Sequence, residues 1–497
     1  MDLRKLTPEH PGQPLRALLA APLPCGGRRH CGNCGVLLRG EASLVSPEEA
    51  ALLQKYAAPP DGYTWRLACF CDILGPVEVL LPQKSAPANA ESQGTLPDYD
   101  GDRPGSYGLA IDIGTTTITL AAYRFPGKEP AAVVSEMNRQ GAFGADVISR
   151  IGGDYKALHG CIRAQLGDML GQTGIPPRDV SRAVVTGNTA MLHFFAGLDP
   201  AGMGRCPYTP QSLFGEAKPW DLLPNAEVYL PPCITAFVGA DIACGALAAG
   251  FTQGGGNALL VDVGTNGEML MRTEGQLRCC SVAAGPAFEG AEISMGMPAL
   301  PGAVDRVWQE GGQLRWHAIS GAPARGICGT GLVSALRAFL ELGTLDETGA
   351  IEHREDDPYL LWGEGGPALW LAGSGVTLTQ RDVRRLQLVK AAVAAGIAAM
   401  LDEAGFAGGQ IGRLWLAGGF GSYLGPQDAA AIGMIPQTLA SRAFAGGNLA
   451  LRGAAMLLFS QGLRTEAERL ARKTDEIPLA EHKVFQRAFV EEMGFPE

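Results

Sequence analysis

Apolar and polar residues alternate differently in three parts of the chain. From Tyr107 onward, short apolar runs typical of strands alternate with longer stretches that have a helical period. The clearest helical period spans residues 380–404, where apolar side chains recur at steps of three and four: Val383, Leu386, Val389, Val393 and Ile397. Residues 83–106 have almost no apolar content and are rich in Pro, Gly, Ser and acidic residues, which predicts a flexible linker. The pattern indicates an α/β domain after the linker.

The region after the linker contains a loose internal repeat. A β-branched run that ends in Asp112, followed by Gly-Thr and a further strand-like run, recurs around Asp262. Two copies in matched contexts predict two related α/β halves, residues 107–255 and 256–497. A long apolar segment centred on Asp241 resembles a membrane span, but its charge and its many Gly and Ala residues favour a buried helix.

The composition narrows the class of protein. A chain of 497 residues is long enough for two or three domains, and 46% hydrophobic with 18% charged residues is an ordinary globular balance. The net charge of -11 argues against nucleic acid as a partner, because a protein that binds a phosphate backbone needs a basic face. The polar N-terminal sequence lacks the apolar core of a signal peptide. We therefore expect a cytoplasmic protein, without a membrane partner, whose 12 cysteines do not form a disulfide framework.

Five of the 12 cysteines precede residue 72, which makes this part of the chain a candidate metal-binding domain. Three are closely spaced, with gaps of five and two residues, and a distant fourth follows: Cys25, Cys31, Cys34 and Cys69. Such a spacing is typical of the 2Fe–2S site of plant-type ferredoxins, although their first gap has four residues. Glycines between the first three cysteines would let the loop wrap around a cluster. Residues 1–82 are therefore predicted to form a 2Fe–2S ferredoxin-like domain.

Two alternatives stay open for this cysteine cluster. A zinc site usually has two C-x2-C pairs, and the cluster has one, Cys31 and Cys34. Cys71 is an alternative to Cys69 as the fourth ligand, because alternation along a strand would put both side chains on the same face.

The two copies of the repeat have the features of phosphate-binding loops. In each, a glycine after the aspartate lets backbone amides approach a phosphate, and the aspartate can hold Mg²⁺ directly or through water. The first loop comprises Asp112, Gly114, Thr115, Thr116 and Thr117, and the second comprises Asp262, Gly264, Thr265, Asn266 and Gly267. A third element is an apolar strand followed by a glycine-rich turn suited to packing against adenine and ribose: Gly418, Gly419 and Gly421.

Two phosphate loops followed by a late glycine-rich loop, in this order, resemble the superfamily of actin, Hsp70 and sugar kinases. The resemblance implies a two-lobed domain built from duplicated ribonuclease-H-like halves, with ATP bound between them. Glu289, at the end of the run Ala-Gly-Pro-Ala-Phe-Glu, would then lie beside the nucleotide cleft. There it would either orient the hydrolytic water or cap a helix.

Motifs along nearly the whole chain, apart from the linker, resemble a family of corrinoid-activating ATPases that begin with a ferredoxin domain. They include Arg-Leu-Ala-Cys69, Thr-Gly-Asn188, Val-Gly-Ala-Asp241 and Gly-Ile-Cys-Gly-Thr-Gly331. Arg29 stands where the family usually has glycine, and the stretch before Cys25 is short for the opening hairpin of a β-grasp ferredoxin, which implies a trimmed small domain. Longer members also have a middle domain, for which this chain leaves no room between the linker and Asp112.

The resemblance implies ATP-dependent reductive activation. An electron would pass from the 2Fe–2S cluster to the Co(II) corrinoid of a partner protein in a methyltransferase system, giving methyl-accepting Co(I). The implied cofactors are the cluster, ATP and Mg²⁺, and the implied partners are the corrinoid protein and an external low-potential electron donor. A homodimer is one option for the oligomeric state.

Two functions of other classes fit parts of the pattern. A small-molecule kinase of the same superfamily would use the nucleotide loops but would need no cluster. An iron–sulfur electron carrier with a regulatory nucleotide-binding module would have both parts but no ATPase activity stimulated by a corrinoid protein. The related activator of 2-hydroxyacyl-CoA dehydratases holds a 4Fe–4S cluster between two subunits, and the 2Fe–2S spacing speaks against it.

Overall fold

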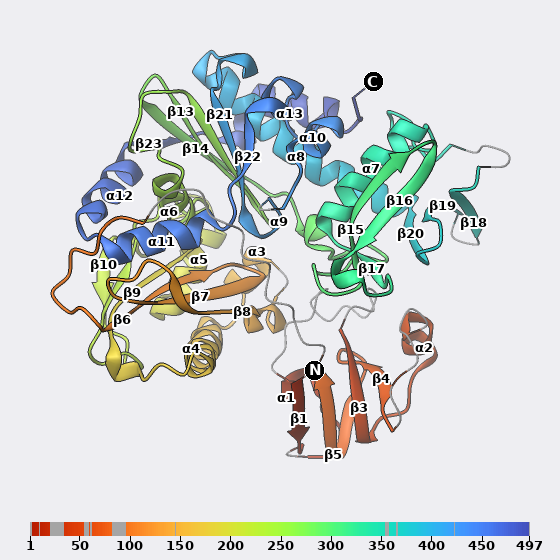
Figure 1. Cartoon of the computed structure of the whole chain (residues 1–497), viewed down its shortest axis with the longest axis horizontal. Coiled ribbons are helices and arrows are strands. Elements are labelled where there is room, and N and C mark those ends of the chain that lie inside the picture. The colour runs from red at the N-terminus through yellow and green to blue at the C-terminus, as the bar shows by residue number, and fades with distance from the viewer. Residues whose placement is uncertain are drawn as a thin grey trace.

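The computed structural model of the chain describes residues 2–8, 10–19, 34–53, 59, 62–81, 96–144, 146–352, 357–363, 366–421 and 423–496. It consists of a small N-terminal domain and a large domain that has two lobes and an insert. In the view of Figure 1 the small domain lies at the bottom, the first lobe at the left, the second lobe at the top and the insert at the right.

The first lobe is a six-stranded sheet in the order β10-β11-β9-β6-β7-β8. β6, β7 and β8 form an antiparallel meander, while β9 pairs in parallel with β6, and β11 with β9. The central strand is apolar at almost every position because both faces of the sheet are covered. The elements are β6 (Tyr107–Ile113), β7 (Thr117–Arg124), β8 (Pro130–Met137), α3 (Val147–Ile151), α4 (Tyr155–Gln172), β9 (Val180–Gly187), α5 (Thr189–Ala196), β10 (Glu216–Lys218) and β11 (Glu227–Leu230).

The second lobe repeats this arrangement in the sheet β22-β21-β12-β13-β14-β23. β12, β13 and β14 again form an antiparallel meander, with β21 parallel to β12 and β22 parallel to β21. The two-lobed fold predicted from the repeat is confirmed. The elements are β12 (Ala258–Val263), β13 (Gly267–Thr273), β14 (Gln276–Val282), α8 (Gln380–Ala404), β21 (Arg413–Ala417), α9 (Gly418–Gly421), α10 (Pro426–Ala431), β22 (Ala443–Ala445), α12 (Gly462–Lys473), β23 (Thr474–Glu476) and α13 (Lys483–Glu491).

Two helices cross between the lobes, α6 (Ala240–Ala248) and α11 (Leu449–Phe459). α6 follows the strands of the first lobe, yet Ile242 packs with Leu260 and other side chains of the second sheet. α11 follows the strands of the second lobe, and Leu457 packs in one cluster with Ala110 of the first sheet. The apolar segment around Asp241 is thus a short helix at the lobe junction. Within the described ranges, none of the helices combines the length and apolar character needed to cross a membrane.

The insert lies between β14 and α8 and consists of two three-stranded sheets with one helix. The first sheet has the order β16-β15-β17, and the second has the order β18-β19-β20. Its elements are β15 (Ala303–Glu310), β16 (Gln313–Ala318), β17 (Gly326–Ile327), α7 (Gly329–Leu342), β18 (Leu360–Gly363), β19 (Gly366–Leu371) and β20 (Val376–Thr379). α7 is buried along most of its length, from Gly329 to Phe339, and packs on β15.

The small domain is an antiparallel sheet in the order β1-β5-β3-β4, with β2 also paired to β5. Because β1 and β2 both pair with β5 rather than with each other, they do not form a hairpin. Leu15, Leu67 and Ile73 are fully buried in its core. Its elements are β1 (Asp2–Leu6), β2 (Gln13–Pro14), α1 (Leu15–Leu19), β3 (Gly35–Ala42), α2 (Pro47–Leu53), β4 (Thr64–Leu67) and β5 (Asp72–Leu81). That this sheet is a trimmed β-grasp ferredoxin stays a prediction.

The second half of the predicted linker is anchored to the large domain, which corrects the expectation of flexibility for residues 96–106. Leu96 is 2% exposed, and the Tyr99 ring stacks on Phe125 with 4.0 Å between ring centroids. Asp100 accepts a hydrogen bond from the Gln461 backbone N–H at 2.6 Å and pairs with Arg182 at 2.9 Å. Leu96, Tyr99 and Asp100 thus attach this polar segment to the large domain. Residues 83–95 lie outside the described part of the chain.

We expect Tyr99→Ala to lower the free energy of unfolding by about 2 kcal/mol, because it removes a half-buried ring stacked on Phe125. Chemical denaturation of the full chain measures this. Asp98→Ala is the matched control from the same segment, because Asp98 is fully exposed in its pair with Lys128, and it should change stability by less than about 0.5 kcal/mol. Equal effects of the two substitutions would contradict the anchor.

Candidate active site and cysteine site

The aspartates of the two repeated loops occupy equivalent places in the two lobes. Asp112 is the next-to-last residue of β6, and Asp262 is the next-to-last residue of β12. The turn after Asp112 is tight, since the Gly114 N–H donates to the Thr117 carbonyl at 3.0 Å. A Cβ at Gly114 would lie 2.5 Å from that carbonyl oxygen, so the turn requires glycine. Thr117 then begins β7.

The glycine-rich turn predicted to face adenosine lies against the second loop. Gly418 directly follows β21, the strand beside β12, and has a φ of +88°. A Cβ there would lie 2.3 Å from Asp262 Oδ1. Gly264 donates to the Asn266 carbonyl at 3.1 Å, and Gly267 begins β13. The structure thus brings the third predicted element to the carboxylate of the second.

Glu289 joins the loops of opposite lobes. Its carboxylate accepts a hydrogen bond from the Thr116 hydroxyl of the first loop and one from the Thr265 hydroxyl of the second, the latter at 3.1 Å. Glu289 is the last residue of a short 3-10 turn (Pro286–Glu289), and it does not cap the start of that turn. Glu289 thus lies between the two repeated loops, and a role in orienting the hydrolytic water stays a prediction.

The carboxylates at this junction disfavour one another's ionisation. Burial raises the pKa of Asp112 to about 6, although Asn448 Nδ2 donates to its Oδ2 at 2.8 Å and opposes the rise. Burial, together with the negative charges of Asp112 and Glu289, raises the pKa of Asp262 to about 7. Burial also raises the pKa of Glu289, and its hydrogen bonds to the two threonines oppose this. A site with this much unbalanced negative charge favours a cation or protons.

Asp241 and Glu268 belong to the same site, and the sequence analysis did not assign them a functional role. Asp241 lies in the first turn of α6, and burial and the charges of Asp262 and Asp112 raise its pKa well above the usual range. Glu268 follows the second loop directly, is 6% exposed, and has a pKa raised by burial and by Asp241. The signal for Asp241 was available, because a carboxylate inside a long apolar segment is costly unless it has a partner or a task.

Asparagines fix the first loop from neighbouring elements. Asn188 Nδ2 donates to the Thr115 hydroxyl at 3.0 Å, and its Oδ1 accepts from the Met191 N–H as the N-cap of α5. Asn138 Nδ2 donates to the Gly114 carbonyl at 2.9 Å. These amides hold the loop through a hydroxyl and a carbonyl, so neither amide occupies a backbone N–H of the loop.

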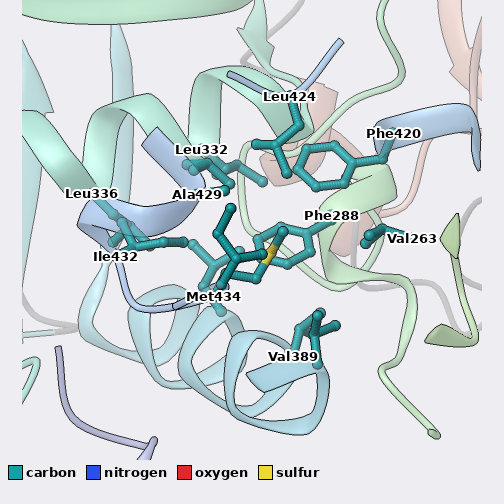
Figure 2. Close-up of a cluster of buried hydrophobic side chains, with 14 of the residues drawn as sticks. Val263, Phe288, Leu332, Leu336, Val389, Phe420, Leu424, Ala429, Ile432 and Met434 are labelled. Atoms are coloured by element: carbon teal, nitrogen blue, oxygen red, sulfur yellow. The ribbon is translucent and has the colours of Figure 1, made fainter. Parts of the chain in front are cut away.

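A cavity of about 430 Å³ lies beyond the glycine-rich turn, between the insert and α10. Its lining includes Asp305, His317, Thr330, Ser334, Tyr423 and Gly425. Figure 2 shows the apolar cluster that joins the same elements, with Phe420 and Leu424 on one side and Leu332 and Leu336 of α7 on the other. Phe420 stacks on Phe288 with ring centroids 4.7 Å apart. The cavity has a polar lining, and the apolar cluster joins the elements that surround it.

Two of the four predicted cluster ligands lie side by side in the small domain. Cys34 Sγ and Cys69 Sγ are 3.2 Å apart, and both side chains are buried. This pair of adjacent thiols fits two ligands of one metal centre. The Cys71 sulfur instead has the Asp72 carbonyl at 3.9 Å, and burial raises the pKa of its thiol to about 11. The geometry thus favours Cys69 over Cys71.

Cys25 and Cys31, with Arg29 between them, fall outside the described residues. In the part of the chain that the structure describes, no three His, Cys, Asp or Glu side chains form a group that could hold a metal ion.

Two models of known protein families match most of the chain. The model described as the C-terminal domain of RACo, the ASKHA domain, matches residues 256–497, and the model described as the RACo middle region matches residues 107–254. We expected the chain to lack the middle domain of longer family members. That expectation is wrong in so far as residues 107–254 match the model described as the RACo middle region. That region coincides with the first lobe.

Individual relatives and a solved structure agree with the family models. The chain is 29% identical to the corrinoid activation enzyme RamQ of Eubacterium limosum, over 80% of this chain and 71% of that protein. It is 25% identical to the [Co(II) methylated amine-specific corrinoid protein] reductase of Methanosarcina barkeri, over 78% of this chain and 77% of that protein. A solved reductive activator for corrinoid, iron–sulfur protein superposes with a TM-score of 0.73 and 26% identity, covering 98% of this chain and 94% of the other. The chain belongs to the RACo family, that of the corrinoid-activating ATPases.

Proposed function

We propose that this chain uses ATP to drive the reduction of Co(II) to Co(I) in the corrinoid protein of a methyltransferase system. The names of the two relatives, a corrinoid activation enzyme and a Co(II) corrinoid protein reductase, support the reaction. The observation that carries the ATP-dependent part is the meeting of two matched loops at Glu289, which accepts hydrogen bonds from both.

The nucleotide would lie between the lobes. The loops from Gly114 to Thr117 and from Gly264 to Gly267 would bind phosphates, and Asp112 and Asp262 would hold Mg²⁺ directly or through water. The raised pKa values of both aspartates support this, because burial disfavours their charged forms and a bound cation would stabilise them. Gly418, Gly419 and Gly421 would lie under the ribose and α-phosphate, and the 430 Å³ cavity beyond them has room for the base.

Glu289 has two states in this proposal. In one, the state in the structure, it accepts from Thr116 and Thr265, and the two hydroxyls hold opposite lobes at one carboxylate. Phosphate oxygens compete for the same two donors, which frees the carboxylate to orient and deprotonate the hydrolytic water. Its raised pKa suits this role, because a general base works best when its pKa is near the working pH.

The free energy required is within reach of a nucleotide-dependent conformational change. A one-electron transfer that is uphill by 0.1–0.2 V needs about 2–5 kcal/mol. Different affinities of the ATP and ADP states for the corrinoid protein can supply a free energy of this size. The reciprocal packing of α6 and α11 makes such states plausible, because movement of one lobe moves a helix that lies on the other.

Cys25, Cys31, Cys34 and Cys69 would hold a 2Fe–2S cluster, which supplies one-electron transfer when bound. The contact between Cys34 and Cys69 supports this ligand set. Lys and Arg balance Asp and Glu in residues 1–82, so the small domain has no net charge to repel either an acidic or a basic partner. An external low-potential donor would supply the electrons, and a homodimer remains one option for assembly.

The assay for this function mixes anaerobic protein, ATP, reductant and candidate Co(II) corrinoid proteins and follows the absorbance of Co(I). We expect Glu289→Gln to lower both ATP hydrolysis and Co(I) formation by about 100-fold or more, because it removes the general base. Glu310→Gln, which changes an exposed carboxylate of the insert, is the control and should behave as wild type. ATP hydrolysis by the wild type without Co(I) formation for any candidate would remove the main support for the proposal. A kinase of the same superfamily would show neither a cluster nor Co(I) formation.

Asp262→Asn should raise the stability of the metal-free and nucleotide-free protein at pH 8. An unfolded aspartate titrates near pH 4, so between about pH 4 and 7 the folded state holds a proton that the unfolded state releases, and stability falls as pH rises through this window. Asparagine removes that loss, which is at most about 4 kcal/mol for a pKa raised from about 4 to about 7. Thermal unfolding in the presence of a chelator measures it at pH 8 and at pH 5. The gain should shrink at pH 5, and a gain that is equal at both pH values would contradict the charge argument.

Tyr423→Ala should raise the KM for ATP about tenfold, the equivalent of about 1.4 kcal/mol, and leave kcat nearly unchanged. The reason is that Tyr423 lines the cavity proposed for the base, whereas the phosphates are proposed to bind at the two loops. Steady-state ATP hydrolysis separates the two constants. Tyr208→Ala, at an exposed tyrosine of the first lobe, is the control. A loss confined to kcat would place the base elsewhere.

A further inference from the structure

A charged pair is buried in the small domain, beneath the turn that carries Cys69. The Glu49 side chain on α2 is 0% exposed, and that of Arg66 on β4 is 4% exposed. Arg66 Nε donates to Glu49 Oε1 at 3.0 Å, and its Nη2 donates to Glu49 Oε2 at 2.9 Å. The contact is bidentate, and this is the geometry in which the attraction between an arginine and a carboxylate best offsets the cost of burying both charges.

The pair holds the backbone on both sides of the turn. Glu49 Oε1 also accepts from the Leu67 N–H at 2.7 Å, where β4 ends. Arg66 donates to the Ser43 carbonyl at 2.5 Å and to the Ser43 hydroxyl at 3.3 Å. The same hydroxyl accepts from the Asp72 N–H at 3.0 Å, where β5 begins. Residues 67–72 are therefore fixed at their start by Glu49 and at their end through Ser43.

This turn presents Cys69 to Cys34. The Ala68 N–H donates to the Cys34 carbonyl at 3.0 Å, and the two sulfurs are 3.2 Å apart. The Cys71 backbone is held in the same turn, since its N–H donates to the Leu67 carbonyl at 3.1 Å and its carbonyl accepts from the Leu15 N–H at 2.8 Å. Its sulfur has the Asp72 carbonyl at 3.9 Å. These hydrogen bonds give Cys69 and Cys71 different neighbours, although strand alternation alone would place both side chains on the same face.

We propose that Glu49 is a positioning residue which, through Arg66 and the Leu67 N–H, sets the place of Cys69 and thereby the environment of the metal centre. This inference rests on the proposed 2Fe–2S site. The pair also balances its own charge, so that neither a positive nor a negative charge faces the centre uncompensated. Removing the carboxylate leaves a buried cation that favours the reduced, more negative centre. Removing the guanidinium leaves a buried anion that disfavours it.

The test uses the full chain, loaded with its cluster, in four variants. Glu49→Gln and Arg66→Met remove one charge each from the buried pair. Glu78→Gln and Arg39→Met make the same changes in an ion pair on the same sheet that is more exposed to solvent. The measurements are the rate of cluster loss to a chelator, the EPR spectrum of the reduced protein, the midpoint potential, and ATP hydrolysis as an independent readout of the large domain.

We expect the Glu49 and Arg66 variants to lose the cluster about tenfold faster or more and to have altered EPR spectra. The midpoint potential should rise in Glu49→Gln and fall in Arg66→Met, with smaller shifts in the controls and wild-type ATP hydrolysis throughout. Wild-type rates, spectra and potentials in both buried variants would overturn the proposal. Shifts of the midpoint potential in the same direction in Glu49→Gln and Arg66→Met would contradict the proposed effect of the pair's charges on the centre.

Arg66→Lys keeps the test decisive if the first two variants purify without a cluster. Lysine retains the charge but replaces the two-pronged contact with a single point contact. We expect a loaded variant with an intermediate rate of cluster loss and an altered EPR spectrum, whereas a wild-type rate and spectrum would overturn the proposal. A wild-type chain that never holds a 2Fe–2S cluster would instead refute the proposed cluster site itself, so the two failures are distinguishable.

Discussion

The large domain is organised around negative charge that is enclosed where the two lobes meet. Asp112, Asp241, Asp262, Glu268 and Glu289 raise one another's pKa values or have them raised by burial. Such a group of carboxylates is tolerable only with protons, hydroxyl donors or a cation nearby. The hydrogen-bond donors to these carboxylates come from both lobes and from the start of α11. The negative charge therefore destabilises the junction when no ligand is bound, and the same charge allows a bound ligand to change how the lobes are held.

The repeat in the sequence predicted the two lobes because each copy is a local pattern, a buried strand that must end in a tight turn. The helix over residues 380–404 was predicted with the bounds of α8 because a long amphipathic period needs no knowledge of its partner. The insert and the exchange of α6 and α11 between the sheets were not predicted, since they depend on packing between distant segments. The linker prediction was wrong for residues 96–106 because Leu96 and Tyr99 pack against the large domain. The average polarity of the segment does not reveal two such apolar contacts.

The same distinction separates the site residues that were found from those that were missed. Asp112, Asp262 and Gly418 sit in motifs of a few residues, and the structure brings them together as those motifs imply. Asn448 contacts Asp112 from 336 positions away, and nothing near it in the sequence indicates this. Glu49 similarly lies on a short helix beside a second glutamate, and nothing near it in the sequence indicates its contact with Arg66. Roles that are created by tertiary contact leave little local signal.

The anchor at Leu96 also sets a geometric limit on assembly. Leu81 ends the last strand of the small domain, and Leu96 is fixed on the large one, so the chain between them can span at most about 50 Å even when fully extended. A sphere of that radius that contains one small domain corresponds to an effective concentration of about 3 mM. Docking of the small domain onto the large one can therefore be millimolar in intrinsic affinity and still be well populated. Contacts of this strength release quickly, so the small domain can dock and undock repeatedly.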